Sequence, residues 1–134
     1  MSDQLLAKEN PRVVVIQKLY GQHLNKDSEI TFPKHRYKKF IKDVVNGTIE
    51  RKELIQNFMD KEWNEDINEN RTELLIKLMI MAYIYEFMFM HKTPVKVVIN
   101  EYLKVADFFV EEPQKGFLNA ILEKVSKVSR TKNG

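Results

Sequence analysis

Apolar residues recur at spacings of three and four along nearly the whole chain, and this helical period constrains the fold more than any other feature. The clearest example follows Asn10-Pro11, an N-cap residue with proline at the first helical position. Its apolar positions are Val13, Ile16, Tyr20 and Leu24. No segment alternates at period two for long enough to predict a sheet. The pattern therefore predicts an all-α fold.

Breaks in the period divide the first half of the chain. Residues 25–33 have no period and are typical of a loop. Residues 34–59 are periodic again but contain Gly47, and glycine costs about 1 kcal/mol inside a helix. We therefore expect either one long helix that bends at Gly47 or two helices joined there.

The second half contains three more helix starts. Asn70 and Glu73 have the spacing of a capping box, which predicts an apolar helix from there to about residue 90. Thr93-Pro94 repeats the pattern of a cap followed by proline, and Pro113 marks the start of a last helix. We expect Phe109 to lie on the apolar face of the helix that follows Pro94.

The length and composition fit one globular domain. The chain has 134 residues, of which 43% are hydrophobic and 31% are charged. A chain of this size buries about two thirds of the surface that it exposes when unfolded. We expect a single domain over residues 1–134, with residues 1–9 and 129–134 flexible.

The residue types that most catalytic and metal sites need are absent or scattered. The chain has no cysteine, which excludes disulfides, cysteine-ligated zinc and thiol nucleophiles. His23, His35 and His91 lie on different segments, and none has a partner at ligand spacing. No glycine-rich phosphate loop is present. We expect a protein that is not an enzyme and that uses no metal, cofactor or small-molecule substrate.

The start of the chain and its most apolar segment argue against export and membrane insertion. Asp3 stands where a signal peptide needs a basic and then an apolar segment. Residues 74–90 are apolar but include Lys77 and Glu86, and each charge costs about 2.5–3.5 kcal/mol at the centre of a membrane. We expect a cytoplasmic protein in which this segment is a buried helix.

Positive charge is concentrated in two segments. Residues 124–134 hold four cations and no acid, and residues 34–43 hold five cations against one anion. In the second of these, His35, Tyr37 and Phe40 alternate with the cations Lys34, Arg36, Lys38, Lys39 and Lys42. This pattern predicts nucleic-acid binding, because cations neutralise phosphates and aromatic rings stack on unpaired bases. The alternative is that both aromatic residues are core residues and the lysines hydrate the opposite face.

The order of motifs resembles the NusB family of transcription antitermination proteins over nearly the whole length. The second half carries the most specific match, formed by Tyr85-Glu86, Pro94, Lys96, Val97, Ile99-Asn100-Glu101, Phe117, Asn119, Leu122 and Lys124. The first half adds a weaker match, formed by Val14, Gln17, Leu19, Tyr20, Leu24, Phe40, Ile41, Val44, Gly47 and Ile55.

The resemblance implies a bundle of about seven helices in two packed subdomains and a role without catalysis. It implies pairing with the ribosomal protein NusE and recognition of single-stranded boxA RNA in nascent transcripts, notably ribosomal RNA. It also implies that the complex joins other Nus factors on elongating RNA polymerase. Recognition of this kind uses two sets of contacts. Cations bind the phosphates, and aromatic and polar side chains contact the unpaired bases.

The resemblance also implies which residues bind RNA. The family's arginine-rich amino-terminal segment maps onto residues 8–12, where Lys8 and Arg12 remain but Glu9 and Asn10 stand in place of cations. We read Arg12 as an RNA contact because the sequence gives no core reason for it. The cluster Lys34, Arg36, Lys38 and Lys39 is expected to supply the phosphate contacts that Glu9 and Asn10 cannot make.

Further site residues map onto the last helix and the central helix. Phe117 and Asn119 match RNA-binding positions, and Lys115 stands in for a family lysine at the position of Gly116. The alternatives are that Phe117 is a core residue and that Asn119 caps a neighbouring helix. For the surface that binds NusE we expect Lys77, Met88, Phe89 and Met90.

A second functional class stays open. The thin basic segment at residues 8–12 is also compatible with a helical interaction module that pairs with NusE but has lost useful affinity for boxA RNA. We expect Glu86 to satisfy buried backbone or tyrosine groups rather than to contact RNA.

Overall fold

The computed structural model describes residues 7–62, 71–90 and 92–133. Within these ranges the regular structure is helical and contains no strand, so the all-α prediction is confirmed. After a helical turn at residues 7–9, the helices are α2 (Pro11–Leu24), α3 (Lys38–Glu50), α4 (Lys52–Glu62), α5 (Arg71–Phe89), α6 (Val95–Ala106) and α7 (Glu112–Asn133).

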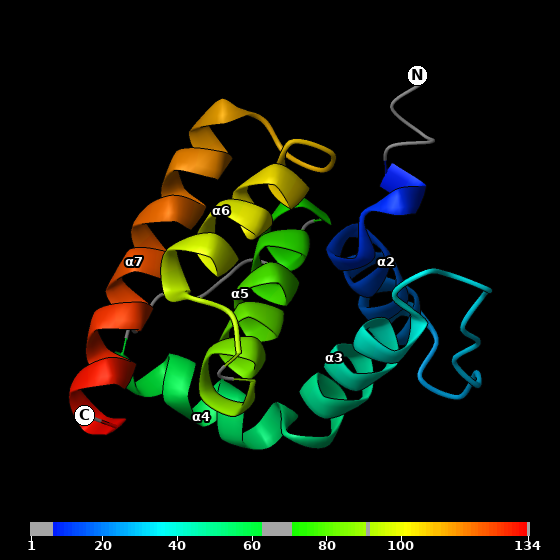
Figure 1. The fold of residues 1–134 in the computed structure, drawn as a ribbon, viewed down its shortest axis with the longest axis horizontal. Coiled ribbons are helices and arrows are strands. Elements are labelled where there is room, and N and C mark those ends of the chain that lie inside the picture. The colour runs from blue at the N-terminus through cyan, green and yellow to red at the C-terminus, as the bar shows by residue number, and fades with distance from the viewer. Residues whose placement is uncertain (1–6, 63–70, 91, 134) are drawn as a thin grey trace.

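Helix α5 is the centre of the bundle. In Figure 1 it lies between the α2–α3 pair and the α6–α7 pair, and it contacts each of the other five labelled helices. Nearly every side chain from Leu74 to Glu86 is buried, as expected of a helix that is apolar on all sides. The helices form two packed groups, α2–α4 and α5–α7, which meet along α5 and where α2 contacts α6.

The segment predicted for residues 34–59 is two helices, but their junction is not at Gly47. Helix α3 begins at Lys38, and Arg51 separates it from α4. Gly47 is buried inside α3, where a Cβ atom would lie 2.1 Å from Cζ of Tyr85. The glycine therefore permits close approach of α5 rather than a break in the helix.

The predicted helix starts are confirmed in part. The Asn10 side chain accepts hydrogen bonds from the backbone N–H groups of Arg12 and Val13, as an N-cap should. Before α6 the N-cap is Pro94 rather than Thr93, and no side chain caps this helix. Asn70 lies outside the described residues.

The two carboxyl-terminal helices also differ from expectation in their bounds. Helix α6 ends at Ala106, so Phe109 follows the helix instead of extending its apolar face. Helix α7 begins at Glu112, which makes Pro113 its second residue, and its backbone is helical to Asn133. The flexibility expected from residue 129 onward stays a prediction. In the described part of the chain, no helix combines the length and the apolar character that a bilayer span requires.

Candidate nucleic-acid interface

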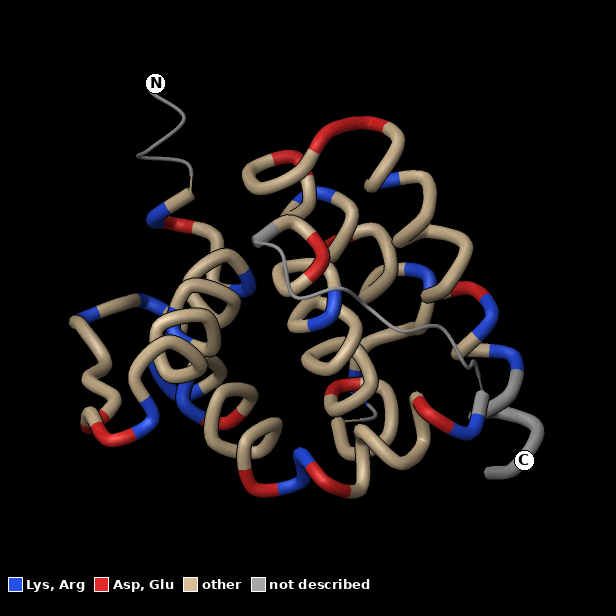
Figure 2. The backbone as a smooth tube through the Cα atoms, turned by 180° about the vertical axis from the view of Figure 1, so that it is seen from behind, with Lys and Arg blue, Asp and Glu red and all other residues tan. Residues whose placement is uncertain are grey.

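The five cations of residues 34–43 form one exposed basic cluster. They lie on the loop ahead of α3 and on its first turns, and all five side chains are exposed. None of them forms an ion pair with a carboxylate of the described residues. In Figure 2, blue segments recur along the loop ahead of α3 and its first turns, at the left of the view. The cluster, defined as Lys34, Arg36, Lys38, Lys39 and Lys42, is available to an anionic partner.

The two aromatic residues of the cluster have different environments. The side chain of Phe40 is half-buried, and the Arg12 guanidinium lies 4.8 Å from the centre of its ring. Tyr37 is 45% exposed, and the guanidinium of Arg36 lies 5.4 Å from its ring centre. The core alternative therefore holds in part for Phe40 and is wrong for Tyr37.

His35 connects the basic cluster to the amino-terminal segment. Its Nδ1 accepts a hydrogen bond from the backbone N–H of Tyr37 at 2.9 Å, and its Nε2 lies 2.9 Å from the carbonyl oxygen of Lys8. Because Nδ1 accepts, the proton of the neutral ring is on Nε2, which donates to Lys8. This bond places the backbone of the exposed Lys8 beside the loop that carries the cluster.

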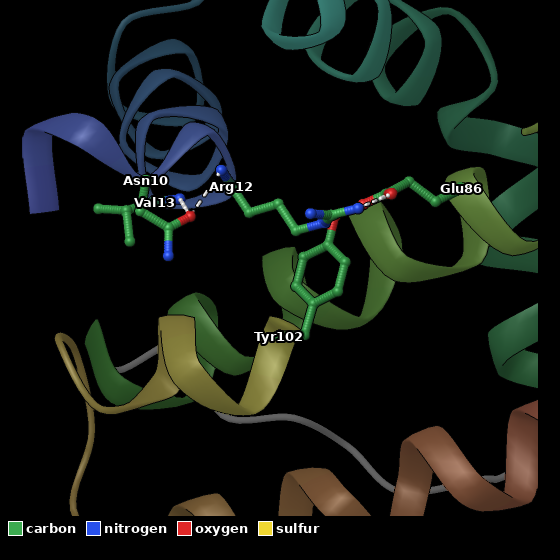
Figure 3. Close-up of polar contacts among 5 residues, drawn as sticks. All are labelled: Asn10, Arg12, Val13, Glu86 and Tyr102. Carbon is green, nitrogen blue, oxygen red and sulfur yellow. Dashed lines mark hydrogen bonds and ion pairs between the residues drawn. The ribbon is translucent and has the colours of Figure 1, made fainter. Parts of the chain in front are cut away.

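Arg12 has a structural partner that the sequence did not reveal. Figure 3 shows its side chain crossing from α2 to Glu86 on α5. Nε donates to Oε2 at 2.9 Å and Nη2 to Oε1 at 2.7 Å. The hydroxyl of Tyr102, on α6, also donates to Oε2. The premise that no core reason explains Arg12 is wrong, because the residue joins three helices through one carboxylate.

Burial makes each member of this network depend on its partners, because an unpaired charge would be costly there. The side chains of Arg12 and Glu86 are only 12% and 3% exposed. Burial lowers the pKa of Arg12, but the hydrogen bond and charge of Glu86 more than offset this and leave the pKa raised. Burial and the Glu86 charge raise the pKa of Tyr102 well above its ordinary value, so its hydroxyl stays a donor. The expected role of Glu86, satisfying a buried tyrosine, is confirmed.

The predicted residues of α7 form a second surface. The Nζ of Lys115 lies 2.8 Å from Oδ1 of Asp107, so this cation is already paired. Phe117 is 45% exposed, which contradicts the core alternative, since the buried neighbours are Leu118 and Ile121. The Asn119 side chain is exposed and makes no hydrogen bond within the described residues, so its capping role has no support.

The structure does not bring these two surfaces together. Helices α5 and α6 lie between α7 and the α2–α3 pair in Figure 1. The predicted NusE-binding residues are also separated along α5. Lys77 is half-buried beside Leu19, His23 and Lys52, whereas residues 88–90 lie at the carboxyl end of the helix.

The carboxyl end of α5 is only partly accessible. Met88 and Met90 are half-buried, and Phe89 is 38% exposed. The Arg51 guanidinium covers part of the Phe89 ring at 4.4 Å from its centre. Of the three residues, Phe89 therefore offers the most apolar surface to a partner.

A groove of about 670 Å³ borders the first surface. One wall is formed by residues 9–12 with Tyr37 and Phe40, and the other includes Met90, Lys92 and Thr93. The sequence placed His35 in the basic segment but did not reveal its bond to Lys8, and it gave no role to Lys92, because local patterns do not indicate tertiary contacts. Among the residues that the structure describes, no group of three or more His, Cys, Asp or Glu side chains is placed to hold a metal ion.

Comparisons with known proteins agree on one family. The sequence pattern of the NusB family matches residues 4–127. The chain is 30% identical over 104 residues to the transcription antitermination protein NusB of Rickettsia typhi, an alignment that covers 78% of this chain and 65% of that protein. Against the protein of the same name from Bradyrhizobium diazoefficiens, identity is 28% over 91 residues, covering 68% of this chain and 55% of that protein.

A solved structure supports the fold. The bundle is similar to T. maritima NusB with a TM-score of 0.75 and 18% sequence identity, over 90% of each chain. The aligned part of this chain spans between about half and two thirds of the length of the two relatives compared by sequence.

Proposed function

The chain belongs to the NusB family, whose members are RNA-binding antitermination factors rather than enzymes, and from this premise we propose that it is such a factor in the cytoplasm. It pairs with the ribosomal protein NusE, and the pair binds boxA-type single-stranded RNA in nascent ribosomal RNA transcripts. With other Nus factors the complex keeps RNA polymerase elongating.

The continuity between Lys8 and the basic cluster is the observation that carries this proposal. A single-stranded RNA needs a track of unpaired cations along its phosphates, and Lys8, Lys34, Arg36, Lys38 and Lys39 provide one. The bond between His35 and Lys8 holds the two segments together. The cations of the loop can therefore make up for Glu9 and Asn10, which stand where the family has cations. The cluster thus supplies the phosphate contacts that the amino-terminal segment cannot make.

Two further groups of residues complete the proposed interfaces. On α7, Phe117 and Asn119 are exposed and offer a stacking ring and an amide to RNA bases. For NusE we propose Lys77 and the end of α5 at residues 88–90, where Phe89 is the most exposed apolar side chain.

One observation favours a second candidate, the interaction module that pairs with NusE without useful boxA affinity. Arg12 is committed to Glu86 and Lys115 to Asp107, so two of the expected RNA-binding cations already have partners. If neither is released, Lys8 and the basic cluster must supply the electrostatic part of the affinity.

A titration separates the two candidates. Fluorescence anisotropy of labelled boxA RNA and of a scrambled sequence is measured with and without purified NusE, at about 50 and 200 mM salt. An antitermination factor should bind boxA more tightly than the scrambled RNA, lose affinity with salt, and gain affinity when NusE is present. Equal, weak binding to both RNAs, together with intact pairing to NusE, supports the interaction module.

Neutralising the basic cluster should weaken RNA binding. Changing Lys34, Arg36, Lys38 and Lys39 to glutamine is expected to lower boxA affinity several-fold. The log–log salt dependence should flatten by about 0.7 for each phosphate of the single strand that is no longer neutralised. All four side chains are exposed, so the circular dichroism spectrum should not change. The measurement is the same anisotropy titration.

The control changes net charge equally at other exposed positions, namely Lys26, Lys52, Lys61 and Lys96. It should retain most of the affinity, and its salt dependence should stay close to that of the unmodified chain. Equal decreases in the two variants would show that net charge matters and the cluster does not.

A lysine added at the start of α7 should strengthen binding. Gly116 is exposed, and nothing lies within 4 Å of a Cβ atom built on it. Gly116→Lys is therefore expected to raise boxA affinity up to several-fold and to steepen the log–log salt dependence by about 0.7. Gly21→Lys on α2, which is equally unobstructed, is the matched control. If both variants gain equally, the α7 surface does not contact RNA.

A further inference from the structure

Tyr37 is an exposed aromatic residue that does not contribute its whole ring to the core. Its ring is 45% accessible to solvent, and it lies within the basic cluster, between Arg36 and Lys38. A single exposed aromatic side chain is ordinary on a protein surface, so it is the position of Tyr37 inside a basic cluster that makes it a candidate for ligand binding. The question is which ligand chemistry this position fits.

The ring is held in a defined orientation. The Tyr37 backbone N–H donates to His35, and the Arg36 guanidinium lies 5.4 Å from the ring centre. One side of the ring thus has a cation against it, and the backbone beneath is fixed to the amino-terminal segment through the His35–Lys8 bond. A planar ligand that stacks here meets a platform that needs little ordering on binding.

The Tyr37 ring faces a groove, whereas the unpaired cations lie outside it. Tyr37 lines the 670 Å³ groove together with three acids, Glu9, Glu86 and Glu101, and two cations, Arg12 and Lys92. Arg12 is paired with Glu86, so two carboxylates and one lysine remain, and the groove favours phosphate less than the exposed basic cluster beside it does. The carboxylate oxygens of Glu9 and Glu101 can accept hydrogen bonds from the exocyclic amino groups of bases. The unpaired cations lie on the adjacent loop and on the first turn of α3. This arrangement fits an RNA that places a base in the groove and its phosphates against the cations outside.

On these grounds we propose that Tyr37 is a stacking platform for one unpaired base of the bound RNA. Arg36 backs the ring, and Lys8 and Lys38 neutralise the phosphates on either side. This inference rests on the proposed function and deepens it, because it assigns a base-binding position to a residue outside the family's matched motifs. Sequence-tolerant stacking of this kind is common in proteins that bind single strands.

The test combines substitution with a fluorescent base. Tyr37→Ala should weaken boxA binding at least about 5-fold and leave the salt slope unchanged, because every cation that meets a phosphate is still present. Tyr37→Phe keeps the ring and should bind within about 2-fold of the unmodified chain, since stacking does not need the hydroxyl. Leu54→Ala, at a residue 51% exposed on α4, is the control for removal of exposed apolar surface and should change nothing.

A direct readout comes from boxA RNAs that carry 2-aminopurine at one position each. Fluorescence at one position should be quenched on binding, and Tyr37→Ala should abolish that quenching, whereas Leu54→Ala should not. If the unmodified chain binds boxA but Tyr37→Ala binds equally well and no quenching depends on Tyr37, this inference fails and the proposed function stands. If the unmodified chain binds no RNA at all, both fail.

Discussion

Replacing Arg12 with alanine is expected to lower the free energy of unfolding by about 3–5 kcal/mol. The substitution leaves the Glu86 carboxylate, which is 3% exposed, with the Tyr102 hydroxyl as its one side-chain donor in the part of the chain that the structure describes. A buried charge without its counter-ion costs far more than the modest net gain that the intact pair provides. The measurement is urea unfolding followed by circular dichroism.

Two controls identify the cause of this destabilisation. Lys104→Ala removes an exposed pair with Glu101 at 3.4 Å and should cost at most about 1 kcal/mol. A triple variant, Arg12→Met with Glu86→Leu and Tyr102→Phe, removes every polar group of the network. It should recover most of the stability, since apolar side chains of similar size often replace buried ion pairs without a penalty.

The opposite result would assign a different role to Arg12. If Arg12→Ala unfolds like the unmodified chain but binds boxA RNA much more weakly, the guanidinium works at the RNA surface and the ion pair is dispensable. RNA binding by this variant is therefore measured at a temperature at which its folded fraction is known.

Replacing Gly47 with alanine is expected to cost about 1–3 kcal/mol, the usual range for adding a methyl group to a packed site. The new methyl group would lie 2.1 Å from Cζ of Tyr85, so the buried ring must move. Its hydroxyl then gives up the hydrogen bond of 2.7 Å that it donates to Asp43. This cost should outweigh the gain of about 1 kcal/mol in helix propensity. Thermal or urea unfolding measures the net effect.

The tyrosine gives this variant a second readout. Burial and the hydrogen bond to Asp43 raise the pKa of Tyr85 to about 12. The resulting stability is fully present below the ordinary pKa of about 10 and is lost as pH rises from there towards 12. In Gly47→Ala, absorbance titration should show one tyrosine shifted back towards pH 10, and stability should depend less on pH in that window.

Gly21 provides the matched control for this experiment. It lies inside α2, and nothing lies within 4 Å of an added Cβ atom. Gly21→Ala should therefore stabilise the protein by up to about 1 kcal/mol. If Gly47→Ala stabilises the protein by the same amount and leaves the tyrosine titration unchanged, the close packing of α3 against α5 is not a constraint.

The sequence predicted those parts of the fold that depend on local patterns. The cap at Asn10 and the buried central helix follow from spacing and backbone preferences within one or two turns. For residues 34–59, two helices were one of the two alternatives. The position of the junction at Arg51 could not be predicted in this way. Gly47 looked like a helix breaker because its reason to be glycine is the Tyr85 ring on another helix.

The same distinction between local patterns and tertiary contacts applies to the candidate site. The basic cluster was visible because its cations are neighbours in the chain, and their exposure agrees with the prediction. Arg12 was misjudged because its partner, Glu86, is 74 residues away. Tyr37 and Phe40 looked equivalent in sequence, yet only Phe40 lies against Arg12, so the tertiary contact separates a packing residue from an exposed one.

The proposed function requires this chain and NusE to form one composite surface for boxA RNA. The most direct test is a pull-down with immobilised leader RNA that contains boxA, using the two purified proteins together and separately, with scrambled RNA as control. We predict that the boxA RNA retains both proteins in equal amounts, and more of each than either protein alone or the scrambled RNA does. Retention of neither protein, or equal retention by both RNAs, would contradict the composite surface.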